Sequence, residues 1–530
     1  MSESFPILSL LTFAPLLGAA LLYLIPAFKI SADPNGSKAQ SFSFLVSILI
    51  FLAACYMLIA FDGTSAEMQF QEQIPWIPAY GISYHLGVDG ISVFLIMLST
   101  FLMPLIFLSS GAVKNQRRGY LANMLILESA MIGTLLSLDV FLFYVFWELM
   151  LTPMYFIIGI WGGRRKIYAT LKFVLYTVFG SLLMLLAIFY VVWQYWQQTG
   201  DVTFALSTLV NGTMLSLKEE ILLFAAFALA FGIKVPIFPF HTWLPDAHVE
   251  APTGGSVVLA GVLLKMGIYG FIRFAYPLLP RGAEAFAPYL AGLAVIGIIY
   301  GALVAWAQSD IKKLVAYSSV SHLGYCVLGL VALNTISVSG SIYQMLNHGI
   351  STGALFLLVG VLYDRKHTRE IADYQGLASK IPVFAFLFLV FTLSSIGLPL
   401  TNGFIGEFLI LTGSFKSFPI MTMFAVLGVI LGAVYMLSLY MKTMYGELNT
   451  DKNSDLTDVN RIELATFIPL FILVFYMGIF PQAFLSTIEP SVNHFIEQVE
   501  QRSQQLEIRE SVQVSRVTIK NQEEGVSYGA

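Results

Sequence analysis

The chain has 530 residues, of which 57% are hydrophobic and only 11% are charged. Soluble domains average about 45–50% apolar and about 25% charged residues, so this composition excludes a water-soluble globular protein. The formal net charge of −4 provides no basic domain of the kind that binds nucleic acid. Cys55 and Cys326, the two cysteines, are too few for an iron–sulfur cluster or a four-cysteine zinc site. The composition therefore predicts a membrane protein, and any redox chemistry must lie in other chains.

Fourteen apolar runs are long enough to cross ~30 Å of hydrocarbon, which takes about 20 helical residues. The runs are residues 5–27, 40–61, 88–111, 119–137, 140–161, 168–196, 219–240, 253–279, 284–306, 310–332, 336–363, 382–412, 417–441 and 463–485. They predict an all-α membrane domain over residues 1–485. The first run lacks a basic flank and a small-residue cleavage site, so it is expected to be a retained helix.

A polar tail, residues 486–530, follows the last run. Hydrophobic residues alternate in part over residues 512–519, which favours a short strand laid on a partner. A disordered end fits the composition equally well, and the sequence leaves both alternatives open.

The basic residues of the loops predict the orientation of the membrane domain. Most loop Lys and Arg residues follow odd-numbered runs, whereas the even-numbered loops contain only Lys218, Arg281 and Lys416. Cytoplasmic loops carry an excess of Lys and Arg. We therefore expect the odd-numbered loops in the cytoplasm and both termini on the opposite, lumenal or periplasmic, side.

Several charged side chains are expected near the middle of the membrane. They are Glu128, Glu148, Lys234, Lys265 and Glu407. A charge at this depth costs at least ~2.5–3.5 kcal/mol, so it persists where it is paired or faces a hydrated cavity. Static ion pairs that hold helices together are the alternative to function. Five such residues together favour an ion pathway.

Lys172 and Arg273 lie nearer the ends of their runs than these five residues do. Long basic side chains near a helix end can extend their charged heads to the membrane interface while their stems stay buried. We therefore expect both residues to snorkel to the interface.

Two histidines fall at the same depth as the charged residues. His322 is about twelve residues into the tenth run, and His348 is about as deep in the eleventh. An imidazole titrates near neutral pH, as a proton relay requires. His241 and His248 flank the end of the seventh run without a recognised ligand spacing, so no metal site is expected. The sequence also lacks a P-loop or a credible dinucleotide fingerprint, which predicts no bound cofactor.

Two of the runs contain residues that break helices. Pro236 and Pro239 follow Lys234 closely in the seventh run, and the twelfth run contains the segment Gly-Leu-Pro-Leu-Thr-Asn-Gly at residues 397–403. Broken backbone inside a membrane is tolerated only where it is buried in protein or lines a hydrated cavity. Two broken helices five apart, each with an ionisable residue, predict an internal five-helix repeat in helices 4–8 and 9–13. A proline kink that only aids packing remains the alternative for each break.

Four segments resemble the antiporter-like membrane subunits of respiratory complex I. They are PFHTWLPDAHVEAPTGGSVVLAGVLLKMGIYG at 239–270, AYSSVSHLGY at 316–325, QMLNHGISTGALFLLVG at 344–360 and GLPLTNGFIGEF at 397–408. The resemblance extends over roughly residues 80–480. Within the family the chain is most similar to chain 4 of NAD(P)H–quinone oxidoreductase, with the cyanobacterial or plastid version favoured and the bacterial respiratory version second.

The resemblance implies fourteen helices with two inverted five-helix repeats, broken helices 7 and 12, and a proton-translocating core at about residues 119–441. The family's relay residues fall on Glu148, Lys234, Lys265, His322, His348 and Glu407, with Glu128 secondary.

The implied function is proton translocation within a multi-subunit NAD(P)H- or ferredoxin–quinone oxidoreductase. The partners are other membrane subunits, which with the rest of the complex hold the iron–sulfur clusters, the quinone (plastoquinone in the favoured version) and the electron-donor site. The expected location is a thylakoid or bacterial inner membrane.

Three alternatives remain. An Mrp-type sodium/proton antiporter subunit shares these motifs and would exchange sodium for protons without quinone reduction. A scaffold subunit would need its buried charges for assembly alone. A quinone-site subunit would be labelled by a photoreactive quinone analogue.

Overall fold

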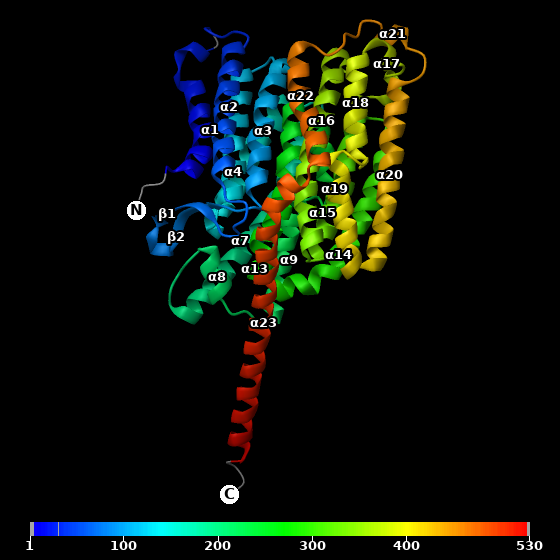
Figure 1. Cartoon of the computed structure of the whole chain (residues 1–530). Coiled ribbons are helices and arrows are strands. Elements are labelled where there is room, and N and C mark those ends of the chain that lie inside the picture. Colours follow the sequence, from blue (N-terminus) through cyan, green and yellow to red (C-terminus); the bar gives the residue numbers. More distant parts are fainter. Residues whose placement is uncertain (1–4, 30, 527–530) are drawn as a thin grey trace.

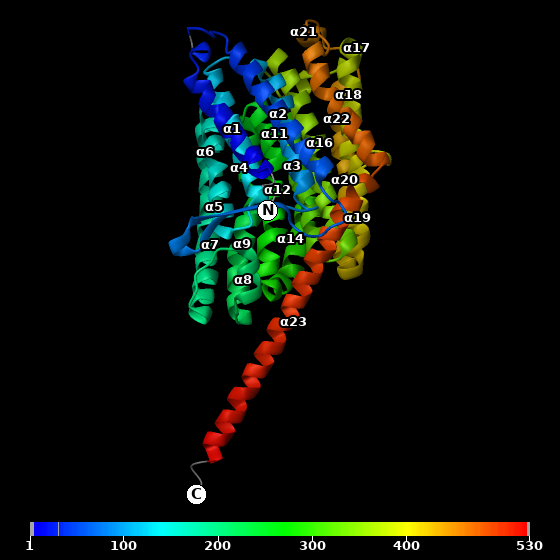
Figure 2. The ribbon, with the colours of Figure 1, turned by 60° about the vertical axis from the view of Figure 1, so that its left-hand side comes forward.

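A single helical bundle forms the membrane domain (Figures 1 and 2). The computed structural model describes residues 5–29 and 31–526, with side chains for all of these except residue 451 and residues 511–526. Within the described residues, 12 helical segments are long and apolar enough to cross a membrane. The two expected spans outside this group are the seventh and the twelfth, which were predicted to be broken. The predicted polytopic all-α fold is therefore confirmed.

Ten of these spans are single helices: α1 (Ile7–Leu24), α2 (Ser37–Ala60), α3 (Val93–Ser109), α4 (Arg117–Leu136), α7 (Lys166–Thr199), α14 (Pro280–Trp306), α15 (Ile311–Val331), α16 (Thr335–Lys366), α20 (Pro419–Met444) and α22 (Arg461–Ile479). Short connecting elements are η1 (Pro26–Phe28), η2 (Pro78–Tyr80), η3 (Ser110–Ala112), α8 (Leu206–Gly212), η6 (Ile371–Asp373), α17 (Leu377–Lys380) and α21 (Thr450–Asn453). The fifth span is divided into α5 (Val140–Leu149) and α6 (Leu151–Trp161).

The seventh span breaks where its prolines predicted. Helix α9 (Leu217–Lys234) ends at the lysine itself, and α10 (Trp243–Glu250) begins nine residues later. Proline has no N–H and its ring clashes with the preceding turn, so the helix cannot continue through Pro236 and Pro239.

The twelfth span also breaks at the predicted segment. It consists of α18 (Pro382–Ser395) and α19 (Asn402–Ser417). Gly397 and Leu400 in the break have φ values of 73° and 77°, a left-handed conformation that a helix does not contain. A Cβ at Gly403 would lie 2.0 Å from the Ser394 carbonyl oxygen, so the two half-helices meet without room for a side chain.

The eighth span, Thr253–Leu278, lies at the centre of the bundle, and its most apolar stretch is entirely buried. It contains two π-helical turns, η4 (Leu259–Leu263) and η5 (Phe271–Ala275), separated by α12 (Lys265–Gly270). The flanking pieces are α11 (Thr253–Val258) and α13 (Tyr276–Leu278). π-turns inside α-helices occur frequently at functional sites. The sequence predicted the span but not its irregular turns.

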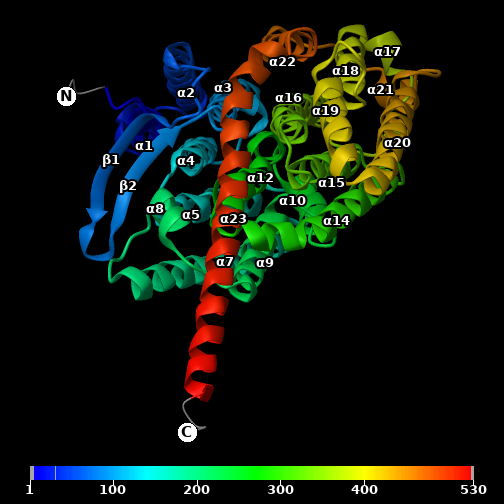
Figure 3. The ribbon, with the colours of Figure 1, turned by 60° about the horizontal axis from the view of Figure 1, so that its bottom comes forward.

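A β-hairpin occupies the loop between α2 and α3, where only a long loop was expected. Strands β1 (Gln69–Ile77) and β2 (Ile82–Val88) pair antiparallel, with Gln73 opposite His85. The Glu72 carboxylate accepts hydrogen bonds from the first turn of α1. The hairpin therefore lies beside α1, along one edge of the bundle, at the end at which α1 begins (Figure 3).

The prediction of a strand or a disordered end in the tail was wrong for residues 486–526, and residues 527–530 lie outside the described residues. Helix α23 (Gln482–Val526) contains residues 512–519, crosses the hairpin end of the bundle and extends beyond it (Figures 1 and 3). A helix satisfies its own backbone hydrogen bonds, whereas a lone strand needs a partner strand to do so. Arg281 fixes this helix by binding Glu220 of α9 at 2.7 Å and Glu510 of α23.

The opposite end of the bundle holds the loops that are rich in Lys and Arg. Ion pairs join these loops to one another, among them Arg369–Asp310 at 3.2 Å and Lys452–Asp373 at 2.6 Å. The basic odd-numbered loops thus gather on one face, which we call the basic face, and the hairpin and α23 lie on the other.

Gly403→Ala tests the close approach at the twelfth span. The added methyl must displace the Ser394 carbonyl, so we expect a loss of roughly 1–3 kcal/mol in stability, typical of overpacking. Thermal unfolding of the detergent-solubilised protein measures the change. Gly432→Ala is the control, because no atom lies within 4 Å of a Cβ there. Equal melting temperatures for the two variants would contradict this account.

Candidate functional site

Lys265 stands at the middle of the buried eighth span and contacts a histidine of a neighbouring helix. Its Nζ lies 2.7 Å from Nδ1 of His348 on α16 and also donates a hydrogen bond to the Ala260 carbonyl oxygen within the π-turn η4. Lys265 is 1% exposed and His348 is 3% exposed. A lysine and an imidazole in direct contact can exchange a proton without water.

A second pair lies beside the first. His322 Nδ1 on α15 is 2.8 Å from Glu407 Oε1 on α19, seated just after the break of the twelfth span. Gln344 Nε2 donates to the same carboxylate oxygen at 3.1 Å. The Tyr435 hydroxyl lies 3.3 Å from His322 Nε2. The Gln344 amide therefore helps to hold the Glu407 carboxylate toward the His322 imidazole.

A small polar cavity lies between the two pairs. The rings of His322 and His348 are 5.9 Å apart between centroids. Both rings line a cavity of about 10 Å³ together with Asn347 and Ser351, and a buried water needs about that volume and two to four polar partners. Within the described part of the chain, Asn347 Oδ1 and His348 Nε2 have no hydrogen-bond partner. The cavity thus has room for about one water beside two residues that have unpartnered polar atoms.

Glu148 and Lys234 form no ion pair within the described structure, although the resemblance implied that they act together. Lys234 is buried, with Nζ 5.1 Å from the centroid of the Trp147 ring. Glu148 Oε1 is buried without a hydrogen-bond partner among the described atoms. Glu148 is nevertheless near enough for its charge to act on Lys234. The glutamate precedes the α5–α6 interruption, and the lysine ends α9.

We call the six predicted relay residues, in spatial order, the buried row: Glu148, Lys234, Lys265, His348, His322 and Glu407. The structure brings the last four into two contacting pairs and the first two into electrostatic range.

Glu128, the secondary candidate, is fully buried in α4, and neither of its oxygens has a hydrogen-bond partner within the described residues. No described contact joins Glu128 to the buried row.

His248 is the residue that the sequence underrated, because it was weighed only as a metal ligand. It is fully buried in α10, stacks on Phe356 at 4.6 Å, and has no partner for either ring nitrogen in the described structure. The charges of both Lys265 and Lys312 act on it. The sequence offered one signal for a role in the relay: His248 follows Lys234 by 14 residues, on the other side of the predicted helix break. No group of three potential metal ligands gathers in residues 5–29 and 31–526.

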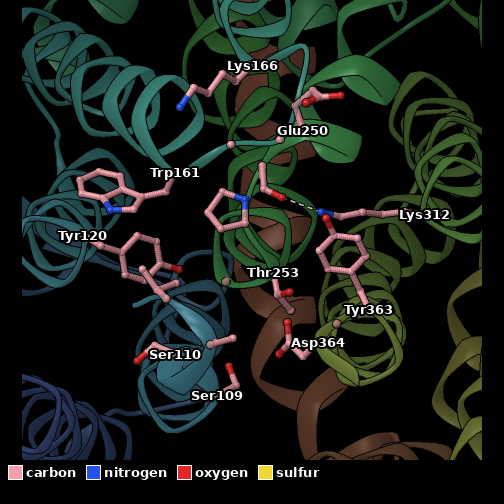
Figure 4. A pocket seen from close by; sticks show the side chains of 18 of the residues that line it. Ser109, Ser110, Tyr120, Trp161, Lys166, Glu250, Thr253, Lys312, Tyr363 and Asp364 are labelled. Carbon is pink, nitrogen blue, oxygen red and sulfur yellow. Dashed lines mark hydrogen bonds between the residues drawn. The ribbon is translucent and has the colours of Figure 1, made fainter. Parts of the chain in front are cut away.

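A polar pocket of about 410 Å³ opens on the basic face (Figure 4). Lys312 and Tyr363 line one side, and Tyr120 and Trp161 line the other. Lys312 Nζ donates to the Ala251 carbonyl oxygen at 2.6 Å. We call this pocket the basic-face vestibule. Thr253 in its wall begins the buried span that carries Lys265, so the vestibule lies at one end of that span.

A second polar pocket, of about 270 Å³, lies at the other end of the same span. The hairpin, α8, η5 and α23 line it, and we call it the hairpin-face pocket. Arg273 in its wall pairs with Asp89 at 2.6 Å. Arg273 is thus held by an ion pair inside the protein, where only an extension to the membrane interface was expected. Lys172 pairs with Asp246 at 2.8 Å, and both side chains are partly exposed, so the expected extension of Lys172 to the interface stays a prediction.

Two family models together match nearly the whole membrane domain. The model described as NADH:quinone oxidoreductase/Mrp antiporter, TM, matches residues 137–432, and the one described as NADH-ubiquinone oxidoreductase chain 4, amino terminus, matches residues 19–136. NADH-quinone oxidoreductase subunit M of Rickettsia prowazekii is 45% identical over 496 residues, covering 93% of this chain and 99% of the relative.

Solved structures share the fold. A chain of respiratory complex I from Thermus thermophilus superposes with a TM-score of 0.83 at 33% identity, covering 93% of this chain and 99% of that one. A chain of the Mrp complex from Dietzia reaches a TM-score of 0.80 at 20% identity, covering 93% and 99%. The Mrp likeness shows a shared fold only.

The relatives from Rickettsia and from Rhodobacter capsulatus are proteobacterial, and they give no support to a cyanobacterial or plastid type. The motifs that identify the family are common to all its branches and could not distinguish between them. The cyanobacterial or plastid type had therefore been favoured only on a judgement of overall sequence similarity. The chain belongs to the family of NADH-quinone oxidoreductase subunit M, or chain 4, an antiporter-like membrane subunit of complex I.

Proposed function

We propose that this subunit moves protons across the membrane through the buried row, driven by electron transfer elsewhere in the complex. The observation that carries the proposal is the pair of contacts Lys265–His348 and His322–Glu407, separated by a polar cavity of the size of one water. Each of these four side chains can both gain and lose a proton. Ionisable residues within a membrane mark proton relays when they face one another in the bundle interior.

The relay begins at the basic-face vestibule. Lys312 lines the vestibule, and His248 lies within electrostatic range of both Lys312 and Lys265. A proton taken up at the vestibule passes by way of His248 to Lys265. It then moves to His348, through the cavity water to His322, and to Glu407, which releases it toward the opposite face.

Glu148 sets the charge state of Lys234 and through it that of Lys265. In one state the carboxylate approaches Lys234 and favours its protonated form, and in the other state the two groups are apart. The absence of a Glu148–Lys234 ion pair among the described contacts is compatible with the second state. A nearby opposite charge favours the charged form of a group, and desolvation disfavours it. A neighbouring subunit that moves Glu148 would therefore load or unload the lysine. Moving one charge against ~100 mV costs ~2.3 kcal/mol, which the redox reaction supplies.

NADH is the electron donor that the relatives' names support, and a bacterial respiratory membrane is the location that we propose. Iron–sulfur clusters and quinone are placed in partner subunits. An NADPH- or ferredoxin-dependent, plastoquinone-reducing enzyme of a thylakoid membrane remains the weaker form of the proposal. We also propose that the basic face is cytoplasmic and that both termini lie on the periplasmic side.

Lys265→Ala and Glu407→Gln each break the row, so proton transfer through this subunit should fall by roughly a hundredfold, the usual contribution of one positioned acid or base. The proton-to-electron ratio of the complex in proteoliposomes measures the effect. Glu148→Gln should lower the same ratio.

Glu284→Gln is the matched control, because Glu284 is exposed at the start of α14. Native gel electrophoresis of the solubilised complex shows whether each variant subunit is assembled into it. An unchanged ratio in Lys265→Ala would refute the proposal. A scaffold role would instead give unassembled complexes in the row variants, with full pumping in any that assemble. Sodium-dependent proton exchange by the wild type would favour the Mrp-type alternative.

Single cysteines test the two pockets and their sides. In a chain with Cys55→Ala and Cys326→Ala, Thr253→Cys in the vestibule should react with a membrane-impermeant thiol reagent from the cytoplasmic side. Ile272→Cys in the hairpin-face pocket should react from the periplasmic side. Mass spectrometry of sided vesicles measures the labelling. Labelling of both cysteines from one side would contradict the orientation.

A further inference from the structure

Two polar pockets lie at opposite ends of the span that carries Lys265. Thr253 and Gly254 line the basic-face vestibule, and Arg273 and Pro277 line the hairpin-face pocket. Lys265 lies between them on the fully buried span, ~12 Å from Arg273 along the axis at ~1.5 Å per residue. A direct path along this span would carry protons between the two faces without using His348, His322 or Glu407. Such a path would be a leak.

The segment between Lys265 and the hairpin-face pocket is filled by groups that cannot pass a proton on. Arg273 Nη2 binds Asp89 Oδ1 at 2.6 Å, and Arg273 Nε donates to the Tyr269 hydroxyl at 3.2 Å. The Tyr269 hydroxyl donates to the Leu135 carbonyl oxygen at 2.7 Å. A guanidinium has no acceptor atom and keeps its proton in proteins. The tyrosine hydroxyl already accepts one hydrogen bond and donates another.

Asp89 holds the guanidinium in place through one carboxylate oxygen. Its Oδ1 receives the guanidinium and hydrogen bonds from Ser92 N at 3.0 Å and Ser92 Oγ at 3.1 Å. The carboxylate is 2% exposed and Arg273 is 9% exposed. The other titratable groups that line the pocket are Glu67, His85 and His494. Glu67 precedes β1, His85 lies on β2 and His494 lies on α23, whereas Arg273 lies on the same span as Lys265.

We propose that Arg273 is the residue that seals the eighth span toward the hairpin face, so that protons on Lys265 leave only sideways through His348. This inference rests on the proposed relay. It adds the barrier that prevents protons from crossing the membrane without passing through the relay. Arg273 is a positioning and barrier residue that touches no transferred proton. The π-turn η5, in which it lies, directs its side chain at Asp89.

The test measures passive proton leak in proteoliposomes of the assembled complex without redox turnover. A pH gradient is imposed, and its decay is followed with a trapped pH dye. Arg273→Gln removes the cation and frees the Asp89 carboxylate, so the gradient should decay about tenfold faster, the effect of one unit charge at ~12 Å in a medium of effective dielectric about 20. Arg273→Lys keeps a cation and should retain the gradient.

Asp89→Asn is the matched control, because it breaks the same ion pair but keeps the cation. Under the proposal it holds the gradient nearly as well as the wild type. The double variant Arg273→Gln/Lys265→Ala should also be tight, because the leak path passes through Lys265. A leak of equal size in Asp89→Asn and Arg273→Gln would show that the pair is only structural and would overturn the proposal. A leak that persists in the double variant would do the same.

The same vesicles separate this inference from the proposed function. If Lys265→Ala alone leaves the proton-to-electron ratio unchanged, the relay proposal fails. If that ratio falls as expected and Arg273→Gln vesicles are nevertheless tight, the relay stands and the seal is refuted.

Discussion

The cost of charge in a medium of low dielectric constant is the constraint on which this structure depends. An ionised side chain at the bilayer centre is stable only where the protein replaces the water it has lost. The structure meets this requirement for Lys265 with a backbone carbonyl and an imidazole, and for Glu407 with an imidazole and an amide. These replacements are themselves groups that bind protons. The contacts that stabilise the buried charge are therefore also the contacts through which the charge can move.

The helix breaks beside Glu148 and Lys234 also follow from the cost of charge in a medium of low dielectric constant. Lys234 is the last residue of α9, where the helix dipole favours a cation, and Glu148 is next to the last residue of α5, where the dipole disfavours an anion. Both groups that set the charge state of the row are thus biased by their helix ends toward the protonated form. An uninterrupted helix would provide neither bias at this depth. The breaks at α5–α6 and α9–α10 are consequently part of the electrostatics as well as of the packing.

The sequence predicted the elements that depend on local composition. Apolar length located the spans, and Pro236, Pro239 and the glycine-rich segment at 397–403 located both breaks, because these residues act on their own backbone. The partners of the buried charges depended on which helices meet, and this is a tertiary property. Neither the Arg273–Asp89 pair, whose members are 184 positions apart in the sequence, nor the position of His248 beside Lys312 leaves a local pattern. The helix over residues 482–526 was missed because its polar sequence carries only a weak periodicity.

The buried row runs sideways through the bundle, and this direction has an energetic consequence. Its members come from α5, α9, α12, α16, α15 and α19, which the sequence places at similar depth. The membrane potential acts along the membrane normal, so a proton that moves along the row does almost no electrical work. Nearly all of the ~2.3 kcal/mol per charge at 100 mV falls on the steps that enter and leave the row. Control of direction therefore belongs at the two ends of the pathway, where a group that cannot release a proton is most effective as a barrier.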